Sequence, residues 1–266
     1  MLTMNNHFPG VLSDEYGQDP YKYIDLLDKT ENVIYDKTLN AHLAISYDAV
    51  LSILENSVLF STKPLSKRAE PVMRGKVLAQ MEGNGHKIKK IMLLHQLTGR
   101  VLKDYYHPKL TNLYDSLLTE IITKNKFESY IDLVISNDCS TNSILQESLR
   151  ITPPVHLIPR QVEDDSCVEG VNLKKRDLIF SLIPSANRDE KYFEHPNTFN
   201  PRREFKGHLS YGVEIHACIG AQFANMQLNI ALQKLVLILK NYKEITPPTF
   251  GGIYTQGATQ YNLERV

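Results

Sequence analysis

One cysteine, Cys218, stands where an irregular polar loop meets a long amphipathic helix. The loop reads HLSYGVEIHAC from residue 208, and apolar side chains then recur at helical spacing towards residue 242. The free amides and the positive dipole end at the start of a helix stabilise a thiolate. A thiolate held in this way is a soft ligand that suits iron. A capped helix with a buried cysteine accounts for this segment equally well.

The rest of the composition excludes several classes of protein. Cys139 and Cys167 are interpreted as small buried hydrophobic residues, because three widely spaced cysteines form neither a disulfide framework nor a C-x-x-C zinc site. Thirty basic residues balance thirty acidic ones, so we expect no nucleic-acid partner. We also expect no membrane association and a cytoplasmic location, because no signal peptide and no membrane-spanning apolar run is found.

The apolar pattern predicts a mainly α-helical protein with a minor β-sheet. Helices are expected near residues 20–27, 46–54, 85–94, 110–122, 129–135, 144–150 and 218–242, and strands near 33–35, 42–45 and within 159–183. The length fits one large domain or two small ones.

Two further pairs of residues share a helix face. Glu147 and Arg150 are three positions apart and can pair, although this spacing is common on solvated helices. His86 and Lys90 are four positions apart, in a segment where Lys87 and Lys89 are expected to point to solvent.

In chain order these segments resemble the cytochrome P450 family. The loop is similar to the family's haem-binding motif F-G-x-G-x-H/R-x-C-x-G-x-x-L-A at Tyr211, Gly212, His216, Cys218, Gly220, Phe223 and Ala224. Glu147-Ser-Leu-Arg150 resembles the E-x-x-R helix, and the run from Ser185 to Arg203 resembles the family's meander. His86 and Lys90 fall where the family usually has H-x-x-x-R, with lysine in place of arginine.

The resemblance implies a cofactor, haem b (iron protoporphyrin IX), whose iron is bound by Cys218. Gly220 would let the flat cofactor approach closely. The two haem propionates need cationic or hydrogen-bonding partners, and the matching positions are His86, Lys90, Arg160 and His216. Glu147, Arg150 and Arg203 would form a structural cluster.

The chain also departs from the family pattern. Glu214 and Arg176 stand where the family usually has glycine. The resemblance covers residues 19–137 and 144–266, and the distal helix with its A-G-x-x-[TS] motif, which helps deliver protons during oxygen activation, is absent. We therefore expect a single haem-binding domain over residues 1–266 with a shortened P450-like fold, a deletion junction near 138–143, and no catalytic residue on the distal side.

Several functions follow from this resemblance. The first is a haem-thiolate protein of the monooxygenase family that receives electrons from a redox partner of ferredoxin or flavodoxin type. The missing motif calls the activity of this chain into question. The alternatives are a non-catalytic haem-binding or accessory protein, and a truncated product without function. The loss of central helices should expose apolar surface on the distal face, which a homo-oligomer could cover.

Overall fold

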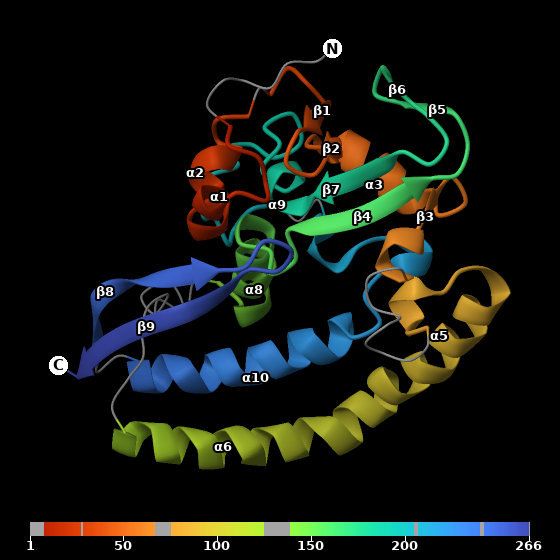
Figure 1. The fold of residues 1–266 in the computed structure, drawn as a ribbon. Coiled ribbons are helices and arrows are strands. Elements are labelled where there is room, and N and C mark those ends of the chain that lie inside the picture. Colours follow the sequence, from red (N-terminus) through yellow and green to blue (C-terminus); the bar gives the residue numbers. More distant parts are fainter. Residues whose placement is uncertain are drawn as a thin grey trace.

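The computed structural model describes residues 8–27, 29–66, 76–124, 139–204, 207–239 and 242–265. In this part of the chain, helices predominate and a small sheet lies beside them (Figure 1). The predicted class, mainly helical with a minor sheet, is confirmed. The helix predicted near residues 129–135 lies outside the described residues.

The main sheet has five strands in the order β1-β2-β7-β4-β3. Their bounds are Val33–Asp36, Ala41–Ala44, Leu178–Leu182, Leu157–Val162 and Phe60–Ser61 in that order. The strands predicted near residues 33–35 and 42–45 are β1 and β2, which pair antiparallel and turn at Asn40, whose φ of 50° is one that asparagine tolerates. β2 runs parallel to β7, with Leu43 opposite Phe180, and this pairing joins the N-terminal part to the C-terminal half.

Short helices cover this sheet, and side chains cap the first turns of α1, α2 and α3. They are α1 Asp14–Gln18, α2 Pro20–Ile24, α3 Tyr47–Glu55 and α9 Ile183–Ala186. The Asp19 carboxylate accepts from the amide of Lys22, and the Ser46 hydroxyl accepts from the amide of Ala49. These bonds fix the starts of α2 and α3, the helices expected near residues 20–27 and 46–54. Buried apolar residues of α3, such as Ile53, pack against the sheet.

The longest helices lie on the other side of the molecule. α5 Gly83–Leu97 leads through the π-helical turn η2 Val101–Tyr106 into α6 His107–Lys124. α6 runs alongside α10 Ala221–Leu239, and α8 Thr141–Ile151 packs against α10 (Figure 1). Within the described ranges, no helix has the length and apolar character needed to cross a bilayer.

Hairpins and single turns complete the described part. The hairpins are β5 Ser166–Val168 with β6 Val171–Leu173, and β8 Tyr242–Gly251 with β9 Gly257–Arg265. The turn η1 Leu78–Gln80 precedes α5, whereas η3 Leu209–Tyr211 and η4 Glu214–His216 form the loop before α10. This loop and the start of α5 meet where the main sheet ends.

Candidate functional site

Cys218 lies in the loop directly before α10. Its amide donates to the Tyr211 carbonyl at 2.6 Å, and its own carbonyl accepts from the amide of Ala221 at 3.3 Å. Gly212 turns the loop with φ 64° and ψ −175°, a backbone region that favours glycine. The helix begins at Ala221, three residues after the predicted start, and leaves the Cys218 side chain exposed.

A cavity of about 450 Å³ opens beside this cysteine. Its lining includes five of the six residues predicted to bind the cofactor, namely His86, Lys90, Arg160, His216 and Cys218. The sixth residue, Gly220, lies next to the sulfur, since a methyl group added there would be 3.9 Å from Sγ of Cys218. Residues from α5, β4 and the loop before α10 therefore meet at one place.

Three buried polar atoms around this cavity are unsatisfied. Among the described residues, Nδ1 of His86, Nε of Arg160 and Nε2 of His216 have no hydrogen-bond partner. The His86 side chain is 2% exposed and that of Arg160 is 4% exposed, while the rings of His86 and His216 lie 4.9 Å apart. Buried polar atoms are almost always paired in native proteins, so these three point to a ligand rich in acceptor atoms.

Burial is the main reason why the pKa values of these groups are lowered. Burial and the nearby charges of Arg160, His86 and Lys90 together lower the pKa of His216 to about 4. Burial also lowers the pKa of Arg160 to about 10. An anionic group in this cavity, such as a pair of carboxylates, would raise the pKa of both residues and so oppose these shifts.

Lys90 also lines the cavity, but its ammonium is engaged elsewhere. Nζ donates to the carbonyl oxygens of Ile215 at 2.7 Å, Ala217 at 2.8 Å and Glu214 at 3.4 Å. An ammonium has three N–H donors, so these contacts use all of them. The structure thus gives Lys90 partners in the cysteine loop, where the sequence predicted a propionate.

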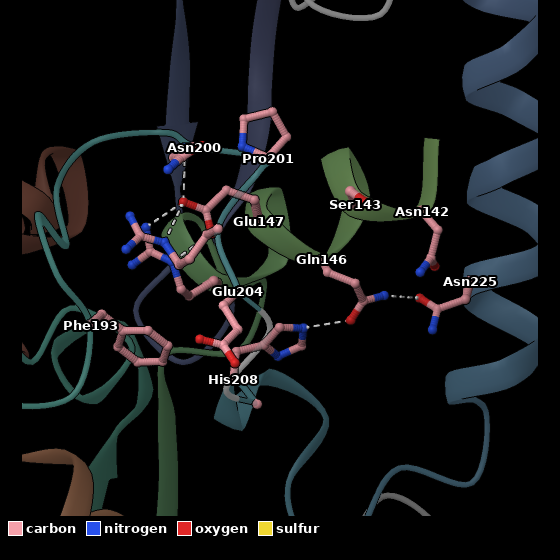
Figure 2. Close-up of a pocket in the computed structure, with 13 residues that line it drawn as sticks. Asn142, Ser143, Gln146, Glu147, Phe193, Asn200, Pro201, Glu204, His208 and Asn225 are labelled. Carbon is pink, nitrogen blue, oxygen red and sulfur yellow. Dashed lines mark hydrogen bonds and ion pairs between the residues drawn. The ribbon is translucent and has the colours of Figure 1, made fainter. Parts of the chain in front are cut away.

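A second cluster surrounds the predicted Glu147–Arg150 pair (Figure 2). Oε2 and Oε1 of Glu147 accept from Nε and Nη2 of Arg150, both at 2.8 Å. The amide of Asn200 and Nε of Arg203 also donate to Oε1, at 3.0 Å and 3.2 Å. Burial alone would raise the pKa of Glu147, but these hydrogen bonds outweigh it and lower the pKa. The structure therefore brings together the three residues predicted as a structural cluster.

A polar network that was not predicted from the sequence lies beside that cluster. Oε1 of Gln146 lies 3.1 Å from Nε2 of His208, and its amide nitrogen lies 3.5 Å from Oδ1 of Asn225. These side chains line a second cavity of about 420 Å³ together with Glu147 and Arg203 (Figure 2). They come from α8, the cysteine loop and α10, so no spacing in the sequence could have linked them.

Comparisons with known proteins give these sites a context. The cytochrome P450 profile matches residues 139–249, which include the Glu147 cluster and the cysteine loop. Pulcherriminic acid synthase of Bacillus subtilis is 24% identical over 386 aligned residues, covering 93% of this chain and 95% of that protein. Cytochrome P450 109 of Bacillus spizizenii is 40% identical over 103 residues, 39% of this chain and 25% of that protein.

These matches support the conclusion that the chain is a cytochrome P450 family member. Its fold agrees, because the crystal structure of the P450 enzyme CYP109B1 from Bacillus subtilis superimposes with a TM-score of 0.78. That likeness covers 93% of this chain and 100% of the other, and at 15% sequence identity it concerns the fold alone.

This P450 is shorter than its relatives. The alignment with pulcherriminic acid synthase runs over 386 positions, whereas the chain has 266 residues, so a large part of that relative has no counterpart here. Cytochrome P450 109 is matched over only a quarter of its length. The predicted junction near 138–143 stays a prediction, and Asp138 itself lies outside the described residues.

P450 proteins contain haem, and the cavity beside Cys218 fits that group. The haem carries two carboxylates, and the cavity offers them the unsatisfied donors of Arg160, His86 and His216. A cysteine sulfur lies in the same lining, at the exposed end of the loop. The chemistry of the available donors thus suits a haem more closely than a neutral ligand.

The two positions at which this chain lacks a glycine of the P450 pattern coincide with strained backbone. Glu214 has φ 49° and Arg176 has φ 79°, both in the left-handed region that favours glycine. The backbone at both positions therefore has a conformation that suits the glycine of the family pattern better than a larger residue. A side chain in this region costs about 1–2 kcal/mol.

Replacing Glu214 by glycine is expected to raise the melting temperature of the protein by a few degrees. The relief of backbone strain exceeds the entropy cost of glycine, so the free energy of unfolding should rise by up to about 1 kcal/mol. For a chain of this size, that corresponds to a rise of roughly 2–4 °C in the melting temperature. The Glu214 side chain is exposed, so little contact is lost. Calorimetry should show no such gain for Glu214→Ala, which keeps the strain, and an equal gain in both variants would contradict this explanation.

Proposed function

We propose that this chain holds haem b with the Cys218 thiolate as the axial ligand of the iron. The observation that carries the proposal is the set of three buried nitrogen atoms without partners, one of Arg160 and one each of His86 and His216, that surround one cavity together with that cysteine. Arg160 would bind a propionate through its guanidinium, and the neutral rings of His86 and His216 would donate further hydrogen bonds. A thiolate-bound haem supplies the reductive activation of oxygen on which the family's hydroxylations depend.

We further propose that this chain is a weakly coupled member of the monooxygenase family. Its sequence contains no A-G-x-x-[TS] motif, so no acid and alcohol pair at that position can deliver protons. A monooxygenase site must also exclude water, and the relative contains a large part that is missing from this chain. Electrons would come from a protein of ferredoxin or flavodoxin type, as in other P450 proteins.

With surrogate redox partners, the haem-loaded chain is expected to consume far more reductant than the hydroxylated product accounts for. The physical reason is that proton delivery is not controlled and water enters the site. Reductant consumption and product formation would be measured together for a panel of small hydrophobic substrates. A complete P450 such as CYP109B1 with the same partners serves as the control, and product matching reductant in the 266-residue chain would refute weak coupling.

A non-catalytic haem-binding or accessory role is the second candidate. It is favoured by apolar side chains that α5 and α6 leave in solvent, among them Met92 at 66% exposure and Leu113 at 49%. A homo-oligomer, as predicted from the sequence, would cover part of this surface. Analytical ultracentrifugation distinguishes a monomer from that assembly.

A further inference from the structure

Lys90 differs from the other lysines of its helix. Lys87 and Lys89 are exposed, as predicted for a solvated basic face, whereas Lys90 is half-buried against the cysteine loop. Its three carbonyl partners belong to Glu214, Ile215 and Ala217, which lie in η4 and at the residue after it. The Lys90 ammonium therefore links α5 to the segment that immediately precedes Cys218.

These carbonyl groups are a suitable site for an ammonium ion. The Glu214 carbonyl already accepts from the amide of Ala217 at 3.0 Å, whereas the carbonyls of Ile215 and Ala217 lie at the end of the turn. Carbonyls at the end of a helical turn carry partial negative charge, so a cation stabilises them. Hydrogen bonds from a charged donor are stronger than bonds between neutral groups. They therefore help to hold the left-handed backbone of Glu214, which lies in the same turn.

The geometry also explains why lysine suits this position. An ammonium directs its three donors around one point, whereas the planar guanidinium of arginine directs its donors within a plane and suits a carboxylate. The arginine of the family pattern H-x-x-x-R would therefore fit a propionate, and the lysine of this chain fits three converging carbonyls. Arg160, His86 and His216 still have unsatisfied donors for the anionic groups.

We propose that Lys90 is a positioning residue that holds the η4 turn in the shape that presents the Cys218 sulfur to the cavity. It acts through the backbone of the loop, before any haem is bound, and makes no contact with a propionate. The inference rests on the proposed role of Cys218 as the ligand, and it concerns this chain's substitution of lysine for arginine.

The test compares Lys90→Met with Lys89→Met in the full chain. The first variant keeps an apolar stem without donors, and the second removes a neighbouring exposed charge from the same helix. Hydrogen exchange of the haem-free protein would be followed in peptides covering residues 209–220, where the amides of Gly212, Ala217 and Cys218 are hydrogen-bonded. We expect exchange to become at least about tenfold faster in Lys90→Met, consistent with the loss of charged hydrogen bonds, and unchanged in Lys89→Met.

A second measurement separates this proposal from the proposed function. Haem transfer to an excess of apomyoglobin gives the release rate for each variant, and Lys90→Met should release haem faster. Faster release with unchanged exchange in the haem-free loop would overturn the proposal, because it would mean that Lys90 binds the haem itself. If the wild-type chain showed no thiolate-bound haem, the proposed function would fail, whereas the exchange experiment would still decide whether Lys90 holds the loop.

Discussion

Replacement of Glu147 by alanine is expected to leave little folded protein. Glu147 is 5% exposed and accepts four hydrogen bonds, so its loss leaves the buried guanidinium of Arg150, itself 2% exposed, without its carboxylate. Removing one partner of a buried ion pair costs about 3–5 kcal/mol, a large share of the roughly 5–15 kcal/mol that stabilises a typical protein. Soluble yield and the urea midpoint of the haem-free chain measure this loss.

The matched control is Asp165→Ala, which removes a carboxylate from an exposed ion pair with Lys174. Exposed pairs contribute less than about 1 kcal/mol, so this variant should fold normally. If Glu147→Ala lost no more stability than Asp165→Ala, the cluster shown in Figure 2 would not have the structural role assigned to it.

Replacement of Arg160 by methionine is expected to maintain or raise the stability of the haem-free chain but to weaken the binding of haem. In the haem-free chain, Nε of Arg160 is buried without a partner, so removing the charge should leave stability unchanged or raise it. In the haem-bound chain the same substitution removes a charged partner of a propionate, which costs about 2–5 kcal/mol, or roughly 30-fold or more in affinity. Haem titration and urea unfolding of the haem-free protein measure the two effects.

Arg176→Met is the control for this prediction, because Arg176 is an exposed arginine in a surface turn. Arg176→Met should leave both the haem affinity and the stability of the haem-free chain unchanged. Unaltered haem affinity in Arg160→Met would remove Arg160 from the cofactor site, whatever the stability of the haem-free chain.

Local structure was predictable because its determinants are close in the sequence. Asp19 and Ser46 mark helix starts through hydrogen bonds to amides three residues later, and the structure shows both bonds. The spacing of Glu147 and Arg150 likewise places them on one face of α8. The position of Cys218 before a helix followed from the change between a polar loop and an apolar repeat.

Contacts between distant segments were not predictable in the same way. A cation four residues after His86 is compatible with a propionate or with the carbonyls of a loop, and only the packing of α5 against η4 gives Lys90 its partners. The parallel pairing of β2 with β7 depends on the whole fold, as does the network of Gln146, His208 and Asn225. The strain at Glu214 was visible only as a departure from a glycine pattern, and its φ supplies the reason.

The central claim is that the chain binds haem through the thiolate of Cys218. The most direct measurement is the absorption spectrum of the haem-loaded, reduced protein after addition of carbon monoxide, recorded for the wild type, Cys218→Ala and Cys167→Ala. The prediction that Cys167 is buried is wrong, because it is an exposed free cysteine in the β5–β6 hairpin. It therefore controls for the loss of a thiol. The wild type and Cys167→Ala should give the spectrum of a thiolate-bound haem, and Cys218→Ala should lose it. A thiolate-type spectrum that persists in Cys218→Ala, or is absent from the wild type, would contradict the assignment.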